Sequence, residues 1–130
     1  MGYYFSKTVQ TTFDDAVNRV TEELKKEGFG VLTSIDVKET LKKKIDVDFR
    51  NYRILGACNP SLAYRALTAS HQVGLFLPCN VTVSQREEGI IEIALVDPLT
   101  MLEVVSNPQL RPIAEEAKAR LDRVAAALQK

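Results

Sequence analysis

The sequence predicts an α+β domain with a mainly antiparallel sheet of about five strands, covered on one face by two long helices. Three observations predict this fold: alternating segments typical of strands, periodic apolar segments typical of helices near both ends of the chain, and a hairpin close to residue 89. The hairpin excludes an all-parallel sheet, and no glycine-rich phosphate loop follows a predicted strand. The expected order is β-α-β-(α)-β-(α)-β-β-α, within a single domain spanning residues 1–130.

The chain begins with a predicted strand and a predicted helix. Residues 3–9 alternate well enough for a strand that opens the sheet. Thr12, followed three residues later by Asp15, has the spacing of a helix N-cap, and apolar residues then recur at helical spacing. We therefore expect an amphipathic helix that ends before Gly28.

A second strand and a short helix are predicted next. Residues 29–36 read as the strand, and Asp36 with Glu39 predicts the N-cap of a helix over residues 37–46. The apolar stripe of this helix is narrow. The densest basic run of the chain, residues 42–44, is explained by an exposed helix face.

The middle of the chain joins an apolar strand directly to a helix. Residues 52–58 predict the strand, and Asn59 followed by Pro60 predicts the start of a helix. Asn accepts a hydrogen bond from an unpaired N–H group, while proline fits the first helical position without losing a bond. This helix is expected from Ser61 to about Ala69.

The last part of the chain is predicted to form two strands and a long helix. Residues 73–85 read as a strand broken at Pro78, where the missing N–H implies an edge position, a bulge or a bend. A turn over residues 86–89 leads into an antiparallel strand over residues 90–98. Residues 110–128 predict a helix with an apolar seam, which packs either on its own sheet or on a second subunit. The seam consists of Leu110, Ala114, Ala117, Leu121, Val124 and Leu128.

Composition and charge exclude several classes of function. Seventeen basic and seventeen acidic side chains cancel, so no net field attracts nucleic acid. No signal-peptide pattern is present, and no stretch approaches the roughly 18 apolar residues of a membrane span. We therefore expect a cytoplasmic protein with reduced cysteines and without a membrane partner. The single histidine, His71, lacks neighbouring ligands at metal-site spacings, so we expect no metal and no cofactor.

Several segments resemble a known family across nearly the whole chain. They are "KEGFGVLTSIDVKETLKKKI", "YRILGACNPSLAYRAL" and "VGLFLPCNVTV", followed by an acidic and apolar strand that ends in "VDP". These segments are similar to the bacterial and archaeal family catalogued as domain of unknown function 302. The resemblance implies a fold like that of the TATA-binding protein, and a homodimer. It implies no reaction, because the family has none established.

The only two cysteines each precede an asparagine at a predicted strand end. Cys58 lies just before a helix N-cap, where the helix dipole favours a reactive thiolate, although an inert buried cysteine explains it equally well. Cys79 follows Pro78 at a bend that can direct a side chain into a cleft. We therefore expect a ligand pocket near the two Cys-Asn segments, and no residue is assigned a catalytic role. The expected pocket residues are Cys58, Asn59, Ser61, Cys79 and Asn80.

We expect the protein to be a non-catalytic module that either binds a small ligand or has a regulatory role. That ligand is either a small molecule or an anion, the latter held by the N–H groups and the Ser61 hydroxyl at the helix start. One alternative is thiol-dependent redox or sulfur-transfer chemistry through Cys58 and Cys79. Another is a dimeric scaffold that associates through the C-terminal seam. Whether the protein is an enzyme stays open at this point.

Overall fold

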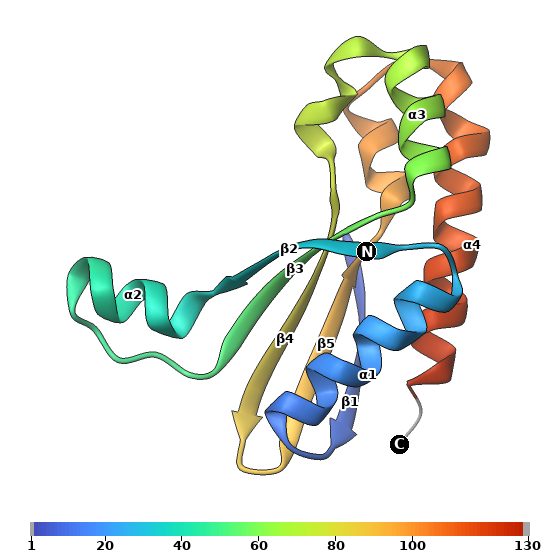
Figure 1. Cartoon of the computed structure of the whole chain (residues 1–130). Helices are drawn as coiled ribbons and strands as arrows, with labels where there is room; N and C mark the ends of the chain where they lie inside the picture. The colour runs from blue at the N-terminus through green and yellow to red at the C-terminus, as the bar shows by residue number, and fades with distance from the viewer. Residues whose placement is uncertain (1, 129–130) are drawn as a thin grey trace.

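The computed structural model, which describes residues 2–128, contains one antiparallel sheet of five strands (Figure 1). The spatial order of the strands is β1-β5-β4-β3-β2, and every neighbouring pair is antiparallel. The predicted α+β class is confirmed. The strands are β1 (Tyr4–Gln10), β2 (Gly30–Asp36), β3 (Tyr52–Cys58), β4 (Cys79–Glu87) and β5 (Ile90–Val96).

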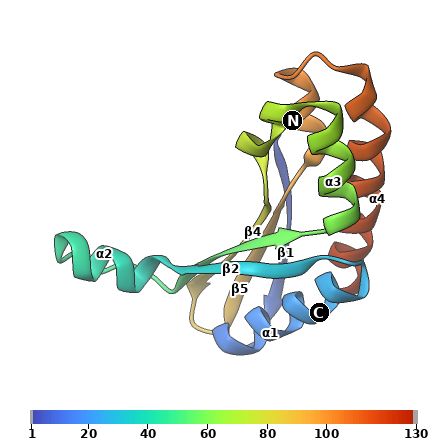
Figure 2. The same cartoon turned by 45° about the horizontal axis from the view of Figure 1, so that its top comes forward.

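Helices α1 and α4 lie against one face of this sheet (Figure 2). Short 3₁₀ helices connect α3 to β4 and β5 to α4. The α-helices are α1 (Phe13–Lys26), α2 (Val37–Ile45), α3 (Pro60–Ala69) and α4 (Arg111–Ala127). The 3₁₀ helices are η1 (His71–Phe76), η2 (Pro98–Glu103) and η3 (Pro108–Leu110).

Local capping signals position the first two helices as predicted. The Thr12 hydroxyl accepts a hydrogen bond of 3.1 Å from the Asp15 N–H at the start of α1. The Asp36 carboxylate accepts one of 3.0 Å from the Glu39 N–H at the start of α2. Gly28 follows the end of α1 with a φ of +85°, a left-handed conformation that glycine adopts without strain.

The core lies between the sheet and the two long helices. In β5 buried and half-buried residues alternate, so Ile91, Ile93 and Leu95 face the helices. All six residues of the C-terminal seam are buried in their own chain. The seam therefore packs within the chain, and it offers no surface to a second subunit.

Helix α2 and the chain around it form an arm that extends away from the rest of the molecule (Figures 1 and 2). No residue of α2 is buried, although the helix carries an apolar stripe. Its C-terminal residue Ile45 is 63% exposed.

The prediction of a strand over residues 73–85 is wrong for its first half. Residues 71–76 form η1, and β4 begins at Cys79, directly after Pro78. Strand β4 lies between β3 and β5, where a proline would remove a ladder hydrogen bond. The chain before Pro78 therefore leaves the sheet, and the apolar run folds as a 3₁₀ helix with Val73 buried.

We expect the replacement Gly56→Ala to destabilise the protein. A Cβ at Gly56 in β3 would lie 2.9 Å from Cγ of Pro78 and would also meet the Thr33 side chain. Overpacking of this kind lowers the free energy of unfolding by about 2 kcal/mol, which urea denaturation measures. The matched control is Gly30→Ala in β2, where nothing lies within 4 Å of the added Cβ. Equal stabilities of the two variants would contradict the close packing at Gly56.

Candidate functional site

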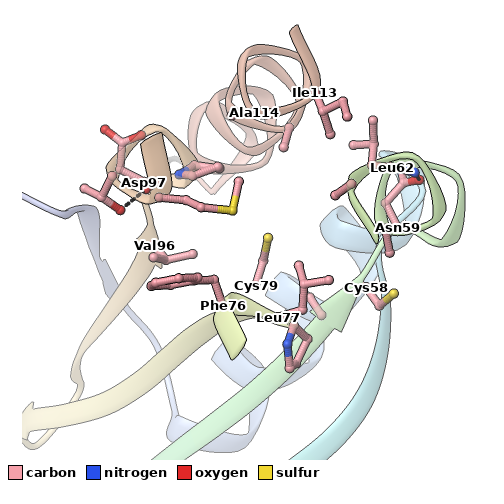
Figure 3. A pocket seen from close by; sticks show the side chains of 18 of the residues that line it. Cys58, Asn59, Leu62, Phe76, Leu77, Cys79, Val96, Asp97, Ile113 and Ala114 are labelled. Atoms are coloured by element: carbon pink, nitrogen blue, oxygen red, sulfur yellow. Dashed lines mark hydrogen bonds between the residues drawn. The ribbon is translucent and has the colours of Figure 1, made fainter. Parts of the chain in front are cut away.

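A cavity of about 310 Å³ lies at the end of the sheet where β3 and β5 end and β4 begins. Its walls come from these strand ends, α3, the chain before β4, η2 and the first turns of α4 (Figure 3). The lining is mainly apolar, with Leu62, Val96, Met101 and Ile113 among the residues that form it.

Cys79 is the predicted site residue that points most directly into this cavity (Figure 3). It is the first residue of β4 and lies opposite Ala57 of β3, on the side of the sheet that the helices cover. Burial raises the pKa of the Cys79 thiol from 9.0 to about 11, and the nearby Cys58 thiol adds to this rise. At neutral pH, Cys79 therefore contributes an uncharged thiol to the cavity wall.

Cys58 also lines the cavity, but the two sulfur atoms point in different directions (Figure 3). The strand register explains this difference. Ala57 is the partner of Cys79, and consecutive residues of a strand point to opposite faces, so Cys58 is turned away from Cys79. Both cysteines are free thiols.

Asn59 lines the cavity and caps α3, as its position before proline predicts. Its side-chain oxygen accepts a hydrogen bond of 3.1 Å from the Leu62 N–H, and its amide donates one of 3.5 Å to the carbonyl of Glu27. Both ends of this side chain are therefore engaged with the backbone. Ser61 lies exposed in the first turn of α3 and does not line the cavity.

Asn80 lies on the opposite face of the sheet from the cavity. It pairs with Gly56 in the register and contributes to a shallower hollow of about 500 Å³. Thr82, Ser84 and Arg86 follow it along the same face of β4, which none of the described helices covers. The structure thus brings together Cys58, Asn59 and Cys79 of the predicted pocket, while Ser61 and Asn80 lie elsewhere.

Several cavity residues were not singled out from the sequence. Met101 lies in η2, and Ile113 and Ala114 lie in the first turns of α4. Ala114 belongs to the predicted seam, so helical spacing indicated that it packs against an apolar surface but not that its methyl group borders a cavity. Only the packing of η2 and α4 over the strand ends identifies these residues.

Within residues 2–128, no group of three or more His, Cys, Asp or Glu side chains comes together as a metal site. In the same part of the chain, no helix is long and apolar enough to cross a membrane. His71 is exposed at the start of η1 and does not line the cavity.

The raised pKa of Cys79 predicts a pH-dependent contribution to stability. Because the folded state holds the thiol proton more tightly than the unfolded chain, this contribution is complete below pH 9.0 and is lost as the pH rises towards about 11. The free energy of unfolding of the wild type, minus that of Cys79→Ala, should fall by roughly 2–3 kcal/mol over this range. Denaturant titrations at each pH measure this difference. The other titrating groups are the same in both proteins, so their effects on the free energy of unfolding cancel in the difference. A difference that stays constant from pH 8 to pH 11 would rule out a buried, protonated thiol.

Comparison with known proteins identifies the family. No curated protein matches the chain. A solved structure that matches is described as "Crystal structure of uncharacterized conserved protein DUF302 from Bacillus stearothermophilus". It is 34% identical, the match covers 99% of this chain and 100% of that chain, and the TM-score is 0.90. The family model described as Domain of unknown function DUF302 matches residues 5–128, and the chain therefore belongs to this family.

Proposed function

We propose that this protein binds a small, largely apolar molecule in the cavity of about 310 Å³ and acts as a binding or regulatory module without catalysis. The observation that carries the proposal is the cavity itself, an apolar space lined by segments far apart in the sequence. Ligand pockets have volumes of roughly 300–1,000 Å³ and mainly apolar walls. A volume at the lower end of this range suits a compact ligand.

The cavity does not favour the thiol-dependent alternative. The pKa of Cys79, raised to about 11, keeps its thiol protonated near neutral pH, whereas nucleophilic and redox-active cysteines react as thiolates. Cys58 points away from Cys79, so the two residues are not arranged as a dithiol pair (Figure 3). The described residues that line the cavity include neither histidine nor lysine to act as a base.

Filling the cavity tests the proposal. Ala114 is buried at the cavity wall, and its methyl group points inward (Figure 3). We expect the uncharged, polarity-sensitive dye prodan to bind the wild type saturably, and Ala114→Leu to weaken this binding by at least about tenfold, or 1.4 kcal/mol. Fluorescence titration measures both affinities.

The matched control for this test is Ala119→Leu, which adds the same three carbons to an exposed position of α4. It should bind prodan as the wild type does. Because a cavity-filling leucine adds apolar contacts, Ala114→Leu should retain the fold, which circular dichroism checks. Equal binding by Ala114→Leu and the wild type, or no saturable binding of the dye to the wild type, would refute the proposal.

A second candidate function, a homodimeric scaffold, is favoured by the arm rather than by the C-terminal seam. Helix α2 has nine residues, none of them buried, and an isolated helix shorter than about 12–15 residues is marginal in water. Its apolar stripe of Val37, Leu41 and Ile45 would gain burial on a second copy of the chain. We therefore assign the proposed dimer contact to the arm.

Substitution in the arm tests the dimer. Ile45→Asp should raise the dimer dissociation constant by at least about tenfold, because it introduces a charge where the contact would bury an apolar side chain. Sedimentation equilibrium measures this constant. Leu75→Asp provides the control, since Leu75 is 81% exposed in η1, outside the arm. A wild type that stays monomeric, or a dimer insensitive to Ile45→Asp, would exclude the arm as the contact.

A further inference from the structure

We infer that the ligand of the cavity carries no negative charge, and that the cavity discriminates against carboxylates and phosphates. This inference rests on the proposed function and narrows the chemical class of ligand that the site accepts. Lys, Arg and His are all absent from the described residues that line the cavity. Two acidic residues, Asp97 and Glu103, do line it. Within residues 2–128, neither carboxylate has a basic side chain within 4.0 Å.

The start of α3 does not compensate for this lack of positive charge. Pro60 has no N–H group to donate, and the Leu62 N–H already donates to the Asn59 side chain at 3.1 Å. The Ala63 N–H donates to the Asn59 carbonyl at 2.9 Å. At most the N–H of Ser61 is left in the first turn, and Ser61 does not line the cavity. Of the donors considered for an anion from the sequence, at most the N–H and hydroxyl of Ser61 remain, and they lie outside the cavity wall.

The remaining polar groups of the wall are neutral or engaged. The amide of Asn59 donates to the Glu27 carbonyl, and the Thr100 hydroxyl donates to the Asp97 carbonyl at 2.6 Å. Cys79 contributes a protonated thiol at neutral pH. An anion in this cavity would lose its hydration against apolar walls and would lie near the carboxylates of Asp97 and Glu103, of which Glu103 is exposed, and both effects disfavour the charged form. An uncharged apolar molecule loses little hydration and gains contact with the same walls.

A matched set of ligands tests the charge preference. 1-Octanol, octanoate and octylamine each have eight carbons in an unbranched chain and differ in the head group and its charge. At pH 7.5 we expect 1-octanol to displace prodan from the wild type at least about tenfold more effectively than octanoate, because the octanoate carboxylate would lose hydration against apolar walls. Competition fluorescence measures the three affinities, and Ala114→Leu should weaken that of 1-octanol.

Removing the carboxylates separates their effect from that of the apolar wall. The double variant Asp97→Asn with Glu103→Gln should lower the ratio of 1-octanol affinity to octanoate affinity by about tenfold. Asn retains the capacity to cap η2, where the Asp97 side chain now accepts from the Leu99 N–H at 3.0 Å. The matched control is Glu87→Gln with Glu88→Gln, which changes the net charge equally at the opposite end of β4 and should leave the ratio as in the wild type.

The outcomes distinguish this inference from the proposed function. If prodan binds and Ala114→Leu weakens its binding, but octanoate competes as well as 1-octanol, the inference is wrong and the proposed function stands. Failure of 1-octanol to displace bound prodan also overturns the inference. If the wild type binds neither prodan nor any of the three ligands, the proposed function fails, and the inference fails with it.

Discussion

The carbonyl oxygen of Glu27, at the end of α1, is the point on which the arrangement of three helices depends. It accepts hydrogen bonds from the Asn59 amide at 3.5 Å and from the Arg120 guanidinium at 3.0 Å. Asn59 begins α3 and Arg120 lies in α4. One carbonyl at the end of α1, where the helix itself supplies no donor, therefore joins all three helices. Gly28 follows it, where a Cβ would lie 2.8 Å from the Asn59 amide nitrogen. The positive φ and the space for Asn59 both require glycine there.

The cavity is a consequence of antiparallel topology combined with this helix junction. Because neighbouring strands are antiparallel, the last residues of β3 and β5 and the first residues of β4 lie at the same end of the sheet. Two connecting segments therefore meet at that end of the sheet: α3 with η1, which joins β3 to β4, and η2 with η3, which follows β5. Helix α4 closes the space between them. The pleat then separates neighbours in the chain, because Cys79 faces the helices and Asn80 faces the uncovered side.

Features that depend on a few neighbouring residues could be predicted from the sequence. Three helix caps were predicted correctly because each is a hydrogen bond between residues close in the chain; they are formed by Thr12, Asp36 and Asn59. The hairpin before Ile90 was also predicted correctly, because it follows from a short turn that ends in glycine. The segment before Pro78 was not, because a short apolar run is compatible with a strand, a helix or a turn. Its conformation follows from β4 lying between two other strands, which is a property of the whole sheet.

The sequence by itself determined the class of the fold, most of its elements and the residues of the C-terminal seam, since these follow from spacing along a single element. Only burial in the folded chain decided that the seam packs within it. Only the tertiary structure decided that Cys58, Asn59 and Cys79 meet Met101 and Ala114 at one cavity, and that Asn80 does not. The direction of a side chain on a strand depends on register and pleat, and a cavity depends on how closely segments distant in the chain approach. Neither quantity is encoded in the spacing of one segment.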